Sequence, residues 1–175
     1  MKKSYKEYLS NITTFVFDVD GVFTDGMLHI TTSGEMLRKM NVKDGYALKT
    51  ALQKDYNVCI ISGGNNEGVK NRFKALGVNA IYLGAHQKLE YLNEYLNMNS
   101  IKSENVLYMG DDIPDIPPMK MVQLATCPQN AVPEVKAVSH YISHKNGGEG
   151  CVRDIIEQVL KVRGDWNSYF SGAND

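Results

Sequence analysis

Short apolar runs without polar alternation recur along the chain, and most are followed by a stretch with helical periodicity. The runs span residues 14–17, 58–61, 80–83 and 106–109, a weaker one spans 122–125, and a short edge strand is predicted at 141–143. Strands that are apolar on both faces need helices on both sides, which is the pattern of a parallel sheet. Right-handed crossovers then give a doubly wound, mostly parallel α/β sandwich of three layers.

The stretches between these runs have apolar residues at helical spacing. Asp44 is suited to cap a helix that buries Ala47, Leu48 and Ala51. Further helices are predicted between the strands or after the last one, over residues 65–76, 87–97 and 151–162. The alternation predicts a Rossmann-like fold, in which ligands bind beyond the carboxyl ends of the strands.

One segment after the first strand departs from this alternation. Residues 26–31 and 36–40 flank a turn at residues 32–35 and predict a β-hairpin. A lone two-stranded hairpin is marginally stable in water, so we expect it to pack on something, including the same hairpin of another subunit. The polar tail, residues 164–175, is predicted to be loosely ordered, with Trp166 and Phe170 there either as docking anchors or as chance apolar residues.

Length and charge exclude several classes of protein. The 175 residues predict one domain over the whole chain, 1–175. With 19 basic and 20 acidic residues the net charge is −1, which argues against a dedicated binder of nucleic acids or anionic membranes. The three cysteines are an odd number and predict buried, reduced thiols of a cytoplasmic protein. The basic N-terminal residues precede no apolar segment, so we expect neither export nor a membrane span.

Polar side chains follow each of the strong strands. Asp18 and Asp20 follow the first, Ser62 follows the second, and Lys88 comes just past the third. Asp111 and Asp112 follow the fourth. Because parallel strands end at the same edge of a sheet, these carboxylates should converge, and their mutual repulsion calls for a cation. Mg²⁺ prefers oxygen ligands and keeps water that a phosphate can displace, so the sequence predicts a Mg²⁺ site.

This set of residues suits phosphoryl transfer. One carboxylate of the Asp18–Asp20 pair can attack phosphorus while the other donates a proton to the leaving oxygen and later activates water. The Ser62 hydroxyl and the Lys88 ammonium can bind the remaining phosphate oxygens.

Four motifs in this order resemble the haloacid dehalogenase superfamily of phosphotransferases. They are Asp-x-Asp-Gly-Val-x-Thr-Asp at residues 18–25, Ser62, Lys88 and Gly-Asp-Asp-x-x-Asp at residues 110–115. The resemblance implies that Asp18 is the nucleophile, that Asp20 is the acid and base, and that Asp18, Asp111 and the Asp20 carbonyl hold Mg²⁺. It implies a supporting role near the metal for Asp112, and for Asp115 either the orientation of Lys88 or the capping of a helix.

The segments between the motifs leave no room for a cap domain. With the hairpin, residues 43–45 and residues 147–150, the chain resembles the capless family of 3-deoxy-D-manno-octulosonate (KDO) 8-phosphate phosphatases over residues 10–163. This resemblance implies hydrolysis of that sugar-acid phosphate, a place in KDO and lipopolysaccharide biosynthesis, and a homotetramer joined through the hairpins. The expected substrate-binding residues are Thr24, Lys43, Asp44, Gly63, Arg72 and Gly148, with Lys70 and Lys74 as further cations for the substrate carboxylate.

Three other functions stay open from the sequence. The phosphatase could act on 2-keto-3-deoxynononate 9-phosphate, which is longer by one hydroxymethylene group. A phospho-accepting receiver domain of signalling proteins also has an acidic Mg²⁺ pocket, although its adjacent acidic pair follows the first strand, whereas Asp111 and Asp112 come late here. A non-catalytic assembly module is the third alternative, which four intact motifs disfavour.

Overall fold

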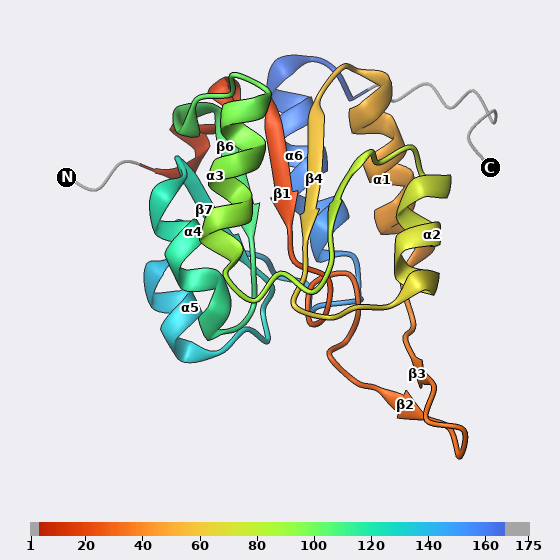
Figure 1. Ribbon diagram of the computed structural model, residues 1–175. Coiled ribbons are helices and arrows are strands. Elements are labelled where there is room, and N and C mark those ends of the chain that lie inside the picture. The colour runs from red at the N-terminus through yellow and green to blue at the C-terminus, as the bar shows by residue number, and fades with distance from the viewer. Residues whose placement is uncertain (1–3, 167–175) are drawn as a thin grey trace.

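The computed structural model describes residues 4–166, and a six-stranded parallel sheet forms its centre (Figure 1). The strand order is β5-β4-β1-β6-β7-β8, and all five neighbouring pairs run parallel. The strands of this sheet are β1 (Thr14–Phe17), β4 (Asn57–Ile61), β5 (Ala80–Tyr82), β6 (Val106–Met109), β7 (Leu124–Cys127) and β8 (Tyr141–Ile142). The predicted doubly wound, mostly parallel fold is confirmed.

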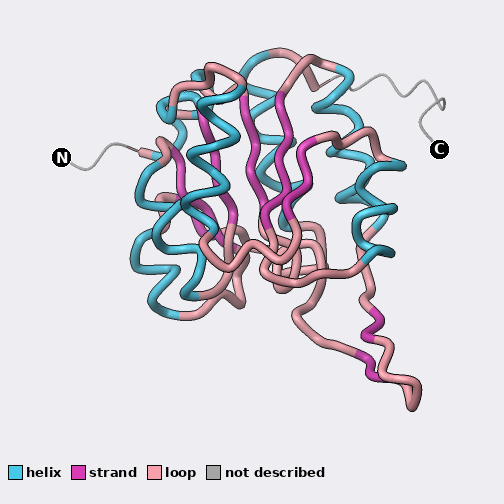
Figure 2. The backbone as a smooth tube through the Cα atoms, in the orientation of Figure 1, coloured by secondary structure: helices cyan, strands magenta, loops and turns pink. Residues whose placement is uncertain are grey.

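Helices cover the sheet on both faces and complete the three layers (Figures 1 and 2). One face carries α1 (Val42–Gln53), α2 (Glu67–Ala75) and α6 (Cys151–Arg163). The other carries α3 (Lys88–Met98), α4 (Ile116–Met121) and α5 (Pro133–Val138). Short 3-10 helices span Tyr5–Glu7, Leu9–Asn11, Ser103–Asn105 and Ile113–Asp115.

Alternate residues of each strand supply two separate apolar cores. In β1, Phe15 and Phe17 face α1, α2 and α6, whereas Val16 faces α3 and the helices beside it. All three side chains are fully buried, as are the corresponding residues of β6. At roughly 25 cal/mol per Å² of apolar surface, this two-sided burial is the main source of stability. This burial also holds each strand in place and so fixes which residues lie at the carboxyl edge of the sheet.

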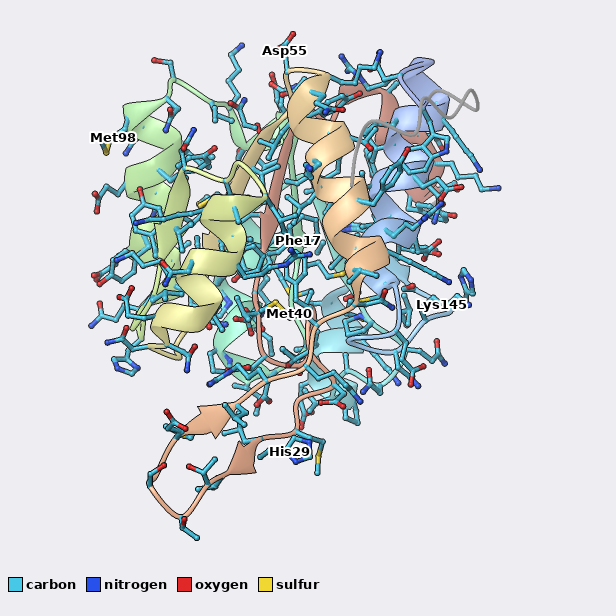
Figure 3. The ribbon with its side chains drawn as sticks, turned by 90° about the vertical axis from the view of Figure 1, so that its right-hand side faces the viewer. Phe17, His29, Met40, Asp55, Met98 and Lys145 are labelled. Atoms are coloured by element: carbon cyan, nitrogen blue, oxygen red, sulfur yellow. The ribbon has the colours of Figure 1, made fainter. Side chains whose placement is uncertain are left out.

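The hairpin is shorter than predicted. Strands β2 (His29–Ile30) and β3 (Met36–Leu37) pair antiparallel over two residues each. The hairpin projects from the body at the end where the loops after β1 and β4 gather, and His29 lies on it (Figures 1 and 3). Between β1 and β4 the chain forms only this hairpin and α1, so no cap domain is inserted there.

Two predictions at the ends of elements were wrong, and one helix was not predicted. The weaker strand begins at Leu124, not at residue 122, because Val122 is the C-cap residue of α4. The apolar run at residues 122–125 does not show where the preceding helix ends. Asp44 does not cap α1: Asn41 does, accepting from the Lys43 N–H at 2.9 Å, and Asp44 lies inside the first turn. Helix α5 was not predicted, since its six residues are too few for a periodic signal.

The remaining sequence predictions concern single residues. Cys59, Cys127 and Cys151 are free and buried, as expected for reduced thiols. Trp166 packs edge-on against Tyr46, at 6.2 Å between ring centroids, and is a docking anchor. Phe170 lies outside the described residues. Within residues 4–166 no helix has the length and apolar character needed to span a bilayer.

Candidate active site

A cavity of about 340 Å³ opens at the carboxyl ends of β1, β4 and β6. Seven of the predicted site residues line this cavity, namely Asp18, Asp20, Ser62, Gly63, Lys88, Asp111 and Asp112. They come from four segments that lie far apart in the sequence and meet because parallel strands place their ends together. The wall is completed by Gly26, Gly64, Ala85, His86 and Pro114.

Lys88 is buried at the start of α3 and joins two carboxylates. Its ammonium nitrogen lies 2.9 Å from Asp18 Oδ2 and 2.7 Å from Asp115 Oδ1. The Tyr108 hydroxyl, buried in β6, donates to the same Asp115 oxygen at 2.9 Å. These contacts hold Lys88 extended toward the cavity beside Asp18, which is where a phosphate would need a positive charge.

Asp115 has both of the roles that the sequence left open. Its Oδ1 atom orients Lys88, and its Oδ2 atom accepts from the backbone N–H groups of Asp111 and Asp112 at 3.1 and 3.3 Å. The second contact is half of a capping box, in which Asp112 caps the 3-10 helix Ile113–Asp115. Asp112 is exposed, and its Oδ1 atom accepts from the Ile113 N–H at 2.8 Å. The fully buried Asp115 is therefore a fixed support for Lys88 and for the loop that carries Asp111.

Three carboxylates form what we call the acidic cluster: Asp18, Asp111 and Asp115 have oxygens within 4.8 Å of one another. Burial, and then the charge of Asp115, raises the pKa of Asp18 to about 7 against the opposing effect of Lys88. Burial, and then the charge of Asp18, raises the pKa of Asp111 to about 8. Burial alone would lower the pKa of Lys88, but Asp115 and Asp18 outweigh it and the pKa is raised. When all three carboxylates are ionised, the cluster carries more negative charge than Lys88 neutralises.

The acidic cluster fits a divalent cation. Asp111 Oδ1 is buried and has no hydrogen-bond partner within residues 4–166. A buried carboxylate oxygen without a partner costs several kcal/mol unless a cation or water reaches it. Asp115 is already occupied by Lys88, Tyr108 and two N–H groups, so Asp111 remains to bind metal, together with Asp18, whose side chain is paired with Lys88. Oxygen donors of this kind suit Mg²⁺.

Asp20 is held by a residue that the sequence analysis missed. The Arg38 guanidinium donates to both carboxylate oxygens of Asp20, at 2.7 and 3.1 Å, and also to the Met36 carbonyl at 3.1 Å. The Arg38 side chain is 8% exposed although it comes from the end of the hairpin. Its position depends on the direction in which the hairpin leaves the body, and no local sequence signal predicts that direction.

The turn after β4 supplies the Ser62 hydroxyl and a glycine backbone with open space beside it. Ser62 is buried, and its hydroxyl oxygen accepts from the Gly64 N–H at 3.3 Å. A Cβ atom on Gly64 would lie 3.1 Å from Asp20 Oδ2, so a larger residue there would crowd the Asp20–Arg38 pair. A Cβ atom on Gly63 would meet open space. The turn therefore leaves Ser62 free to face a ligand.

Several predicted substrate-binding residues lie outside this cavity. Thr24 is fully buried, and its hydroxyl accepts from the N–H groups of Gly21 and Gly26, so it stabilises the loop after β1. Lys43 is exposed on α1. Arg72 lines a separate groove of about 360 Å³ between α2 and the hairpin. None of these residues lines the cavity within the described part of this single chain.

The remaining predicted residues also lie elsewhere. Asp44 is fully buried and accepts from the Arg153 N–H at 2.8 Å, where it cannot reach a ligand in the cavity. Gly148 packs against the backbone of Thr24 and Asp25. Lys70 pairs with Glu67 at 3.6 Å on α2. Lys74 is exposed near the end of the same helix.

Known proteins resemble this chain in sequence and in structure. Residues 80–155, which include Lys88 and Asp111, match the family of haloacid dehalogenase-like hydrolases. The chain is 36% identical over 154 residues to the 3-deoxy-D-manno-octulosonate 8-phosphate phosphatase KdsC of Escherichia coli K12, covering 88% of this chain and 82% of that protein.

Two solved structures of similar proteins superpose on most of the chain. The crystal structure of the 3-deoxy-D-manno-octulosonate 8-phosphate phosphatase from Yersinia pestis has a TM-score of 0.90 and 32% identity, covering 92% of this chain and 87% of that one. The phosphatase of the same name from Moraxella catarrhalis, crystallised with a magnesium ion, a phosphate ion and a KDO molecule, has a TM-score of 0.89 and 30% identity, with 92% of each chain covered.

Proposed function

The chain belongs to the haloacid dehalogenase-like hydrolases, in the family of 3-deoxy-D-manno-octulosonate 8-phosphate phosphatases, and from that premise we propose that it hydrolyses this sugar-acid phosphate with Mg²⁺. The products are the free sugar acid and phosphate, and such a reaction belongs to the synthesis of KDO and of lipopolysaccharide. The observation that carries the proposal is the convergence of Asp18, Lys88 and Asp111 on one cavity.

We propose that Asp18 is the nucleophile and that Asp18, Asp111 and the Asp20 carbonyl hold the metal. An oxygen of Asp18 forms a bond to phosphorus while the bond from phosphorus to the sugar oxygen breaks. Lys88, 2.9 Å from Asp18, neutralises charge on the transferring group, and the Ser62 hydroxyl binds another of its oxygens. Bound Mg²⁺ would neutralise negative charge on the carboxylates and on the phosphate.

Asp20 is proposed to donate a proton to the leaving sugar oxygen and then to accept one from water. That water attacks the aspartyl phosphate on Asp18, releases phosphate and regenerates the free carboxylate. In this structure Arg38 binds both oxygens of Asp20, so the carboxylate must release at least one N–H donor before it carries a proton. Arg38 therefore holds Asp20 in a resting orientation beside the cavity.

Steady-state release of phosphate tests the activity. We expect turnover of 3-deoxy-D-manno-octulosonate 8-phosphate that requires Mg²⁺, and turnover of 2-keto-3-deoxynononate 9-phosphate measured beside it decides between the eight- and nine-carbon substrates. Asp18→Asn should abolish turnover in a chain that stays folded. Full activity in this variant would refute the covalent mechanism, and stoichiometric phosphorylation without release would favour a receiver domain.

We also propose a homotetramer joined through the β2–β3 hairpins. The hairpin exposes apolar side chains that a lone chain would leave in water, including Met27 at 66%, Ile30 at 71% and Leu37 at 52%. Several large apolar side chains exposed on one hairpin indicate a protein interface. Light scattering should show that Ile30→Asp dissociates the oligomer, whereas Met98→Asp, at a 73% exposed residue of α3, should leave it intact. Equal effects of the two variants would contradict this assembly.

The three buried, free cysteines support a cytoplasmic location, since reduced thiols persist in that compartment. We also propose that residues 1–175 form a single domain. Limited proteolysis should then yield no stable fragment smaller than the sheet with its two helical layers.

A further inference from the structure

Asp44 caps a helix other than its own. It lies in the first turn of α1, yet its side chain is fully buried, and Oδ1 accepts from the Arg153 N–H of α6 at 2.8 Å. Gly150 precedes α6 as its N-cap residue and has no side chain to supply that acceptor. An acceptor at a helix N-terminus satisfies N–H groups that the helix itself leaves unpaired. Asp44 thus fixes the start of α6 from a neighbouring helix.

The segment that enters α6 packs tightly on the loop after β1. The Gly148 N–H donates to the Val22 carbonyl at 2.9 Å, and the Cys151 thiol donates to the same oxygen at 3.2 Å. A Cβ atom on Gly147 would lie 1.8 Å from the Gly21 carbonyl oxygen. The backbones are therefore in direct contact, and neither can shift without moving the other.

The other side of the same loop touches the acidic cluster. A Cβ atom on Gly21 would lie 1.9 Å from Asp111 Oδ2, and Gly21 is at a φ of +88°. Gly21 is therefore held between the Asp111 carboxylate and Gly147. It also directly follows Asp20, whose carbonyl is a proposed metal ligand.

We propose that Asp44 is a positioning residue for the metal site: it fixes residues 147–150, which support the backbone at Gly21 against Asp111. This inference rests on the proposed Mg²⁺-dependent function and replaces the expected contact of Asp44 with the sugar. The path consists of the Asp44–Arg153 hydrogen bond, the packing of Gly147 on Gly21, and the packing of Gly21 on Asp111. Asp44 acts only through these groups and touches neither substrate nor metal.

Calorimetric titration of the full chain with Mg²⁺, without substrate, tests the path. Asp44→Ala removes the acceptor and should weaken Mg²⁺ binding roughly tenfold, the lower end of what loss of supporting contacts costs a metal site. Asp44→Asn keeps an oxygen acceptor and should bind Mg²⁺ nearly as the wild type does. Gly147→Ala leaves Asp44 intact but forces the loop away from Gly21, and should weaken binding as Asp44→Ala does.

Asp154→Ala is the matched control. Asp154 lies on the same helix and accepts from the hydroxyls of Tyr141 in β8 and of Ser143, which follows β8, at 2.7 and 2.6 Å. Its loss should lower the melting temperature and leave Mg²⁺ affinity unchanged. Wild-type Mg²⁺ affinity in Asp44→Ala or in Gly147→Ala would overturn the proposal, as would equal weakening in the Asp154 variant. Mg²⁺ binding by a wild type that fails to hydrolyse the sugar-acid phosphate would instead refute the proposed function.

Discussion

Replacing Lys88 with methionine removes the ammonium group that Asp18 and Asp115 share. The side chains of these three residues are 5%, 8% and 0% exposed, so water screens the change poorly. Methionine has a similar length and leaves the apolar part of the packing in place. The substitution therefore isolates the charge at the centre of the cavity.

The contacts set the size of the effect. At an effective dielectric constant of about 20, opposite unit charges about 3 Å apart attract by roughly 6 kcal/mol. Lys88 makes two such contacts, at 2.9 and 2.7 Å, but burying each ion costs several kcal/mol. Removing one member of a buried ion pair typically costs about 3–5 kcal/mol. We expect Lys88→Met to lower the free energy of unfolding by that amount at pH 8 without Mg²⁺.

The loss should grow with pH. Burial raises the pKa of Asp18 to about 7, and of Asp111 to about 8, from an ordinary value of 3.8. The folded, metal-free chain thus keeps protons that the unfolded chain releases, so its stability falls as pH rises from about 4 to about 8. At pH 5 both carboxylates are largely protonated and need Lys88 less. Mg²⁺ binds their ionised forms and should restore part of the stability lost at pH 8.

Urea unfolding at pH 5 and pH 8, with Mg²⁺ and with a chelator, measures these effects. Lys102→Met is the matched control, because Lys102 pairs with Glu104 at 3.7 Å on the surface and should contribute less than about 1 kcal/mol. Lys88→Met should also bind Mg²⁺ more tightly yet hydrolyse substrate more slowly. A Lys88 variant as stable as the Lys102 variant at pH 8 without metal would refute the electrostatic account of the cavity.

Three further substitutions test the remaining contacts of the cavity. Arg38→Ala should slow hydrolysis of the sugar phosphate roughly 10- to 100-fold because Asp20 is misplaced. The rate of Arg38→Lys should lie between those of the wild type and Arg38→Ala. The Arg38→Ala substitution should leave the rate of p-nitrophenyl phosphate hydrolysis unchanged, because that leaving group needs little acid catalysis. Equal losses of rate on both substrates would exclude a role through Asp20. Gly21→Ala drives a methyl group into Asp111, so calorimetry should detect no Mg²⁺ binding, and normal binding would contradict the packing. Ser62→Ala should raise KM for phosphate esters without changing the melting temperature, and an unchanged KM would exclude Ser62 from phosphate binding.

Much of the architecture could be predicted because the signals are local. Apolar runs such as residues 14–17 and 106–109 are short and buried on both faces, so they predict parallel strands without knowledge of their neighbours. A parallel sheet then brings the residues after its strands to one edge. That rule alone predicted that Asp18, Lys88 and Asp111 would meet, and the cavity contains all three.

Roles that depend on distant partners were not predictable in the same way. Asp44 is of a residue type that commonly caps helices and lies near the start of α1, but its partner, the Arg153 N–H, is 109 residues away in the sequence. Arg38 reads as a surface residue of an exposed hairpin, yet it is buried against Asp20. Local sequence patterns, such as periodicity and capping residues, hold no information on either pairing, because each pairing depends on how whole elements pack.

The sequence by itself determined the layered fold and the group of residues that carry the chemistry, since both follow from local periodicity and from the shared direction of parallel strands. The tertiary structure decided which carboxylates are free for a metal and which are already bound: Asp115 is occupied by Lys88 and Tyr108, whereas Asp111 Oδ1 has no partner among the described residues. Residues of the same type have different roles because burial and neighbouring charges fix the free energy of their ionised forms. Only the packing of the folded chain sets that burial and those neighbours.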